Sequence, residues 1–123
     1  MDLHFTEREL DVMGVLWEHG PSTVADVRDR LPDRLAYTTV LTVLRTLEAK
    51  GHVGHREEGR AYRYHALVER DAARESAVSR LKRKLFSGSA ELLLTQLVSD
   101  RDLSDGELER LRSLLDERLD SEG

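Results

Sequence analysis

The chain has 123 residues, 39% hydrophobic and 35% charged, with a formal net charge of −5, which suits one soluble compact domain or one small domain with an extension. It contains no cysteine, which excludes disulfides, thiolate metal sites and thiol catalysis. No apolar run approaches the roughly 18 residues of a membrane span, and the N-terminus MDLHFTERE has no apolar signal core, so the sequence predicts a cytoplasmic protein without membrane insertion.

Two helices are predicted before residue 34. Thr6 and Glu9 form a capping box, in which a hydroxyl and a carboxylate satisfy free backbone N–H groups, and Gly20-Pro21 ends the helix that follows. A second helix opens at Ser22-Thr23 and is ended by Pro32. The spacing of apolar residues gives each helix one face for a shared core.

A third helix is predicted from Thr38 to Lys50, and its two faces carry different kinds of side chain. At about 100° per residue, one face is an apolar stripe of Val40, Val43, Leu44 and Leu47. The opposite face carries threonines and an arginine, whereas a solvated helix face ordinarily carries Glu and Lys. Short hydroxyl side chains beside a forked cation suit a helix in a DNA major groove, and a surface helix with incidental threonines is the alternative. The candidate DNA-binding residues of this helix are Thr38, Thr39, Thr42, Arg45 and Thr46.

The period of apolar residues changes to two in the segment HVGHREEGRAYRYHAL, which predicts a two-stranded hairpin that turns at Glu57-Glu58-Gly59. Three helices followed by a hairpin is the order of a winged helix-turn-helix. We expect the hairpin arginines to contact the phosphate backbone, with a solvated cap as the alternative. These wing candidates are Arg56, Arg60 and Arg63.

The uneven distribution of charge favours this interpretation. Residues 34–66 carry six basic and three acidic side chains, a net +3, while the rest of the chain sums to −8. The positive excess coincides with the predicted recognition helix and wing, so the acidic total does not count against nucleic-acid binding.

After Leu67 the sequence predicts helices only. This part is too short to bury its many leucines by itself, so we expect them to contact a second copy of the chain, with packing on the winged domain as the alternative. The predicted fold is mainly α with a small β-hairpin: a winged helix-turn-helix DNA-binding domain over 1–67 and a helical dimerisation region over 68–123. The candidate dimerisation residues are Val78, Leu81, Leu85, Leu92, Leu93, Leu97, Leu108, Leu111 and Leu115.

No pattern in the sequence supports an enzyme. His52 and His55 lie three apart on a predicted strand, so their side chains would point to opposite faces, and the other histidines have no ligand at helical spacing. No G-x-S-x-G, P-loop or G-x-G-x-x-G motif occurs. The sequence therefore predicts no catalytic residue, no metal site and no cofactor.

Four passages resemble the penicillinase and methicillin-resistance repressor family (BlaI/MecI type): EREL-x-VMGVLW, LAYTTVLTVLRTLEAKGHV, REEGRAYRYHALV and DLSDGELERLRSLL. The resemblance covers nearly the whole chain. It implies a homodimeric transcriptional repressor with N-terminal winged helices and a C-terminal dimerisation region. It further implies binding to a TACA/TGTA-type promoter dyad through helix 36–50 and wing 56–63, in control of a beta-lactam-resistance or related stress operon.

The resemblance also implies a mode of control. Repressors of this family are often inactivated by a membrane sensor-protease system that cuts an Asn-Phe bond in the dimerisation region. The matching position here is Gln96-Leu97, the candidate site of proteolytic control, and its departure from Asn-Phe argues against that route. The copper-responsive branch carries cysteine pairs near its C-terminus, which this chain lacks.

Two other functions fit a winged helix. One is a ligand-responsive regulator of the multiple-antibiotic-resistance (MarR-like) type, although the chain has few aromatic residues to line an effector pocket. The other is a protein–protein adaptor that uses the winged helix without DNA. A gel shift with promoter DNA separates the adaptor from the repressor.

Overall fold

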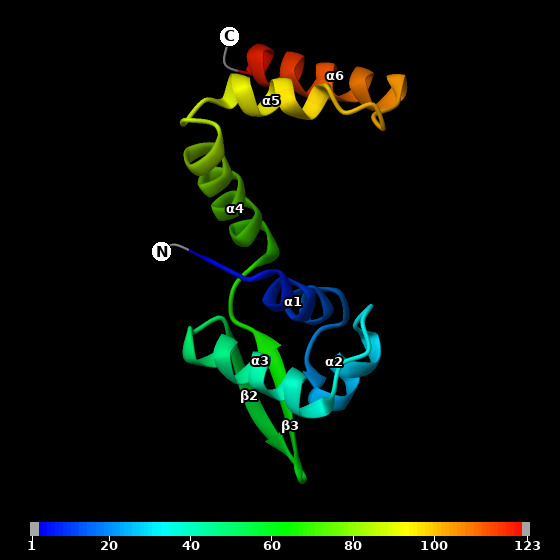
Figure 1. The fold of residues 1–123 in the computed structure, drawn as a ribbon, viewed down its shortest axis with the longest axis vertical. Helices are drawn as coiled ribbons and strands as arrows, with labels where there is room; N and C mark the ends of the chain where they lie inside the picture. Colours follow the sequence, from blue (N-terminus) through cyan, green and yellow to red (C-terminus); the bar gives the residue numbers. More distant parts are fainter. Residues whose placement is uncertain (1–2, 122–123) are drawn as a thin grey trace. The chain divides into compact units, whose positions relative to one another are not determined.

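A computed structural model describes residues 3–121 and shows a mainly helical chain with a small antiparallel sheet, which confirms the predicted fold class (Figure 1). Contacts divide the chain into two compact units, the first through Val78 and the second from Ser79. The elements are α1 (Glu7–His19), β1 (Ser22–Thr23), α2 (Val24–Arg30), α3 (Tyr37–Ala49), β2 (Val53–Glu58), β3 (Ala61–Ala66), α4 (Arg70–Leu85), α5 (Ala90–Val98) and α6 (Asp105–Ser121).

The first two helices begin where local hydrogen bonds predict. Thr6 Oγ1 accepts from the Glu9 backbone N–H at 3.1 Å, and the Glu9 carboxylate accepts from the Thr6 N–H at 2.8 Å. Thr23 and Asp26 form the same capping box at the start of α2. The Thr23 N–H and hydroxyl hold the pKa of the Asp26 carboxyl below its ordinary value by stabilising the anion.

Replacing Thr23 by alanine should destabilise the first unit by about 1 kcal/mol, the usual cost of losing an N-cap hydroxyl. Thr23 Oγ1 accepts from the Asp26 N–H at 3.1 Å, and alanine leaves that donor without its partner. Urea unfolding followed by the fluorescence of Trp17 measures the loss. Thr23→Ser retains the hydroxyl and should stay within experimental error of the parent; an equal loss in both variants would assign the effect to the methyl group.

The predicted two-stranded hairpin is a three-stranded sheet, in the order β1-β3-β2. Ser22 and Thr23 pair antiparallel with Tyr64 and Arg63 of β3. A two-residue strand shows no alternation in the sequence, because its partner lies about forty residues away and supplies the extended conformation. The predicted turn is also displaced: Glu57 and Glu58 belong to β2, and the hairpin reverses at the next two residues.

One core holds α1, α2 and α3 against the sheet in the first unit (Figure 1). The apolar stripe of α3 contributes Val40, Leu44 and Leu47, all fully buried, and Val43 packs at the margin of the core. From β3, Tyr64 is also fully buried, and burial raises the pKa of its hydroxyl. Burying one face of α3 in this way leaves its opposite face available to a ligand.

The first unit extends farther along the chain than the boundary predicted after Leu67. Trp17 Nε1 donates to the Val68 carbonyl at 3.0 Å, and the Arg70 guanidinium lies 5.8 Å from the centre of the Trp17 ring. Ser76 exchanges hydrogen bonds with the backbone of Leu3, at 3.2 and 3.1 Å. The beginning of α4 is therefore part of the winged unit.

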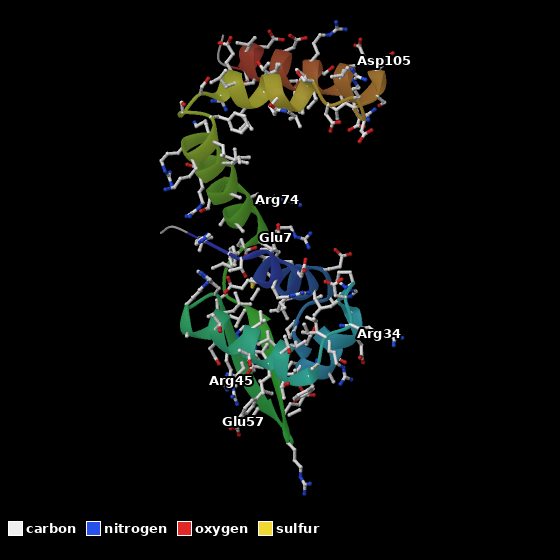
Figure 2. All side chains as sticks on the ribbon, in the orientation of Figure 1. Glu7, Arg34, Arg45, Glu57, Arg74 and Asp105 are labelled. Carbon is white, nitrogen blue, oxygen red and sulfur yellow. The ribbon has the colours of Figure 1, made fainter. Side chains whose placement is uncertain are left out.

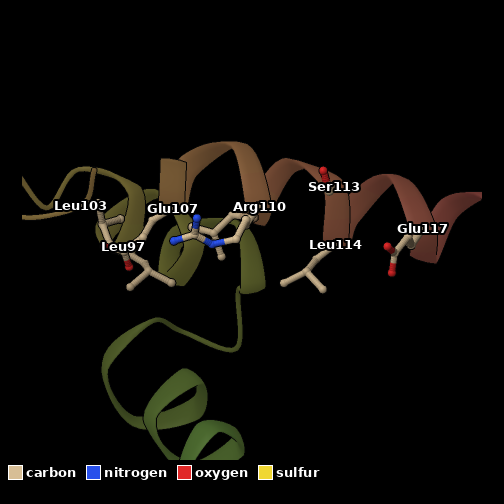
Figure 3. Close-up of a pocket in the computed structure, with 8 residues that line it drawn as sticks. Leu97, Leu103, Glu107, Arg110, Ser113, Leu114 and Glu117 are labelled. Atoms are coloured by element: carbon tan, nitrogen blue, oxygen red, sulfur yellow. The ribbon is translucent and has the colours of Figure 1, made fainter. Parts of the chain in front are cut away.

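The second unit contains α5 and α6 side by side (Figure 1). In the described part of the chain neither helix has a buried residue, although both are rich in leucine. A groove of about 600 Å³ lies along α6 and is bordered by Leu97 of α5, with further apolar lining from Leu103, Leu111 and Leu114 (Figure 3). Among the described residues, no helix has the length and apolar character needed to cross a membrane.

Candidate nucleic-acid interface

The polar face of α3 is exposed, as the helical period predicts. The five candidate residues of this helix all face solvent: Thr38, Thr39, Thr42, Arg45 and Thr46. Figure 2 shows Arg45 extending outward from α3, while Arg34 precedes the helix at its opposite end. The structure thus brings the predicted base-reading residues onto one open surface.

The hydroxyl groups of two of these threonines bond to their own helix. Thr42 Oγ1 donates to the Thr38 carbonyl at 2.9 Å, and Thr46 Oγ1 donates to the Thr42 carbonyl at 3.0 Å. Each hydroxyl proton is already engaged, so these side chains present a methyl group and oxygen lone pairs to a ligand. That chemistry suits contact with a thymine methyl better than donation to a phosphate.

The C-terminal end of α3 is tightly defined. The Gly51 N–H donates to the Glu48 carbonyl at 2.9 Å and the His52 N–H donates to the Leu47 carbonyl at 3.0 Å, which is the Schellman pattern. Gly51 has a φ of +82°, a left-handed conformation that glycine adopts without strain. The chain therefore leaves the helix directly into β2 at a fixed angle.

A side-chain cluster joins α3 to the hairpin, and sequence analysis missed it. His55 Nδ1 lies 2.5 Å from a Glu48 carboxylate oxygen, and the His55 ring packs at a tilt against Tyr62 and Tyr64, with ring centroids 4.5 and 5.4 Å away. Of the two histidines assigned to one strand, only His55 is in β2; His52 precedes it, buried beside Phe5. The described residues contain no group of three or more side chains suited to a metal ion.

The three wing arginines have different surroundings. Arg56 and Arg60 are exposed, and Arg60 is at the hairpin turn after Gly59, whose φ is +64°. Arg63 is half-buried; its guanidinium binds the Glu58 carboxylate and donates to the Pro21 carbonyl at 3.2 Å. The hydrogen bond and charge of Glu58 raise the pKa of Arg63.

These pairs decide which charges of the segment remain unpaired. Of the three acidic side chains in residues 34–66, Glu48 lies against His55 and Glu58 is bound by Arg63, while Glu57 is exposed on the hairpin (Figure 2). Pairing Glu58 with Arg63 leaves the net charge of the segment at +3, because Arg63 is one of the six basic residues counted. The exposed positive charge is therefore carried by the other arginines and Lys50.

The predicted dimerisation residues lie on helices that are only weakly buried in the single chain. Val78, Leu85, Leu92 and Leu115 are all at least half exposed. The remainder range from half-buried to exposed: Leu81, Leu93, Leu97, Leu108 and Leu111. Gln96 and Leu97 lie inside α5, and both side chains are exposed.

Comparison with known proteins identifies relatives over most of the chain. A family model described as penicillinase repressor matches residues 5–117. The methicillin resistance regulatory protein MecI of Mammaliicoccus sciuri is 22% identical over 112 residues, which cover 89% of this chain and 91% of MecI.

Two solved structures share the fold. Bacillus licheniformis BlaI, in its monomeric form in complex with the blaP half-operator, has a TM-score of 0.50 and 27% identity, over 58% of this chain and 89% of that one. A MarR family protein from Bacillus stearothermophilus has a TM-score of 0.55 and 19% identity, over 97% of this chain and 76% of that one, a similarity of fold alone. The winged-helix prediction is confirmed.

Proposed function

The chain belongs to the penicillinase repressor family of DNA-binding transcriptional repressors, and we propose that it acts as a homodimer on a TACA/TGTA-type dyad in a promoter. The observation that carries this proposal is the exposed face of α3, where Arg45 stands among threonines with a hairpin following the helix. The relative whose structure was solved with a half-operator supports the same use of the winged unit.

In this proposal α3 enters the major groove and reads bases there. The Arg45 guanidinium can donate to guanine O6 and N7 together, a pairing that no other base offers in the same geometry. The methyl groups of Thr42 and Thr46 are available to thymine methyls because their hydroxyls bond to helix carbonyls. Thr38 and Thr39, in the first turn, complete the contact with the groove and its phosphates.

The wing then contacts the phosphate backbone. Arg56 and Arg60 are exposed cations and would neutralise phosphates beside the groove. Arg63 shares its charge with Glu58 and bonds to the Pro21 carbonyl, so we assign it chiefly to holding the hairpin at the correct angle. Phosphate contacts set the register of the protein on DNA without selecting sequence.

Arg60→Ala should weaken binding to every duplex alike and reduce the salt slope of log affinity by about one unit, since one phosphate contact is lost. Titrations of operator and scrambled duplexes at several salt concentrations measure both quantities. Arg63→Ala serves as the comparison, because its loss should also lower the stability of the hairpin. A sequence-dependent loss for Arg60→Ala would contradict the backbone assignment.

We propose that the leucines of the second unit form the homodimer interface. Many of them are exposed in a single chain and the others are half-buried, and water contact with so many apolar side chains is unfavourable. A two-fold dimer matches a dyad, and half-sites about one helical turn apart, roughly 34–36 Å, would meet two α3 helices on one face of the duplex.

Binding to a duplex carrying the dyad tests the function directly. We expect saturable binding at low salt with clear preference over a scrambled duplex, and no shift of either duplex would favour the adaptor. Selection of bound fragments from genomic DNA would then test the proposed link to a beta-lactam-resistance or related stress operon. The family resemblance implies a membrane sensor-protease as the partner for release, and a cut at Gln96-Leu97 would detach α6 and its leucines. The departure from Asn-Phe argues against that route.

A further inference from the structure

An ion pair between Lys50 and Glu9 connects the C-terminal end of α3 to α1. It lies away from the exposed face of α3 that would contact DNA. Glu9, in the first turn of α1, is buried with 4% of its surface exposed. Its two carboxylate oxygens lie 2.9 and 2.8 Å from Nζ of Lys50, the residue that caps the C-terminus of α3. One of these oxygens also accepts from the Thr6 N–H at 2.8 Å. Glu9 therefore completes the cap of α1 and also binds the residue at the C-terminal end of α3.

Backbone hydrogen bonds at Lys50 connect this ion pair to the part of α3 that carries Arg45 and Thr46. The Lys50 N–H donates to the Thr46 carbonyl at 3.1 Å, and the Schellman bonds at Gly51 and His52 fix the residues beyond it. Thr46 belongs to this last turn of α3, and Arg45 directly precedes it. Any shift of Lys50 relative to α1 therefore moves the end of the helix that carries Arg45.

Burying the Glu9 carboxylate costs free energy, because the charge is removed from water. Filling the same space with an apolar side chain would not carry that cost. Burial by itself raises the pKa of Glu9, but the hydrogen bonds and charge of Lys50, together with those of Thr6, bring that pKa below the ordinary value. The side chain is therefore an anion inside a domain that has to approach phosphates. Only the carboxylate is buried, since 38% of the Lys50 side chain is exposed. Ion pairs with a buried partner are directional, and their best-attested use is to select one arrangement among several.

We propose that Glu9 is a positioning residue for operator recognition, which acts through Lys50 to hold Arg45 at the correct depth and angle. This inference rests on the proposed base-reading role of α3. Glu9 lies on α1 and would contact no base.

Glu9→Gln separates this role from simple electrostatics, because the two predict opposite signs. Removing an acid reduces repulsion of phosphates and should strengthen binding to any duplex or leave it unchanged. A positioning role predicts about tenfold weaker binding to the dyad duplex, the usual scale of coupling within one network. The scrambled duplex should change by less than about twofold. Glu7→Gln, an exposed acid in the same turn of α1, is the matched control and should keep the parent's affinity for both duplexes.

A double-mutant cycle with Arg45→Ala makes the test specific. If Glu9 acts by placing Arg45, Glu9→Gln should cost little in the Arg45→Ala background, so the two losses will not add. Additive losses, or an unchanged affinity of Glu9→Gln for the dyad duplex, would overturn the inference. If Arg45→Ala alone lost no preference for the dyad, the proposed function of α3 would fail instead, and the two failures are distinguishable.

Folding is checked on the same full-length samples. Trp17 is the one tryptophan of the chain and its indole N–H bonds to Val68 inside the first unit, so its fluorescence reports unfolding in urea. Should Glu9→Gln not fold, Lys50→Met keeps the carboxylate and its Thr6 bond while removing the restraint on α3. It should show the same selective loss for the dyad with an unchanged salt slope; a slope lower by about one unit would make Lys50 a phosphate contact and overturn the positioning role.

Discussion

Leu115→Asp should convert the protein to a monomer and weaken its binding to the full dyad by at least about 100-fold, because two linked half-site contacts become one. Leu115 is 50% exposed in the single chain, so aspartate there should cost the monomer fold little. In a dimer interface the same charge would be removed from water without a partner. Affinity for an isolated half-site should not change, since α3 and the wing belong to the other unit.

Sedimentation at micromolar concentration and titration of the full dyad and half-site measure these effects together. Ser113→Asp is the matched control: it adds the same charge to α6, and residues two apart lie on nearly opposite sides of a helix. It should remain dimeric. A Leu115→Asp protein that stays dimeric would exclude this leucine face as the interface and favour contacts elsewhere on α4 or α5.

Features set by neighbours in the sequence could be predicted. Thr6 and Glu9 cap the start of α1, and Thr23 caps the start of α2. Each cap joins residues close together in the sequence, so the starts of both helices follow from residue types alone. The two faces of α3 follow from its period, and the exposed threonines and Arg45 lie where that period puts them.

Features that join distant segments could not be predicted. Ser22 is extended because Tyr64 pairs with it, and the sequence around Ser22 carries no sign of that partner. Likewise Glu9 and Lys50 lie forty-one residues apart, and neither side chain is unusual at a helix end. In the sequence Glu48 is indistinguishable from an ordinary surface acid, and its contact with His55 depends on how β2 packs beside α3. The candidate surface was thus predictable, whereas the contacts that orient it depend on tertiary structure.

Arg45→Ala should lose about 1–3 kcal/mol of binding free energy on the dyad duplex, roughly 5- to 150-fold in affinity, and much less on a scrambled duplex. The guanidinium is free to reach a base because Glu48, three residues later on the same helix, is held by His55. Arg34→Ala removes the same charge from an exposed residue before α3 and should weaken both duplexes slightly and alike.

A change in the DNA identifies the atom that Arg45 reads. Replacing the guanine of the TGTA half-site with 7-deazaguanine removes the N7 acceptor and keeps the base pair. The parent protein should bind this duplex more weakly than the natural one, by about 1 kcal/mol or more for half of a bidentate pair, whereas Arg45→Ala should not distinguish the two. If both proteins lost the same affinity, guanine N7 would be read by another residue of α3, with Thr42 and Thr46 disfavoured because their hydroxyl protons already bond to the helix. Equal losses for Arg45→Ala on dyad and scrambled duplexes would instead make Arg45 a phosphate contact, and the sequence preference would then reside in the threonine methyls.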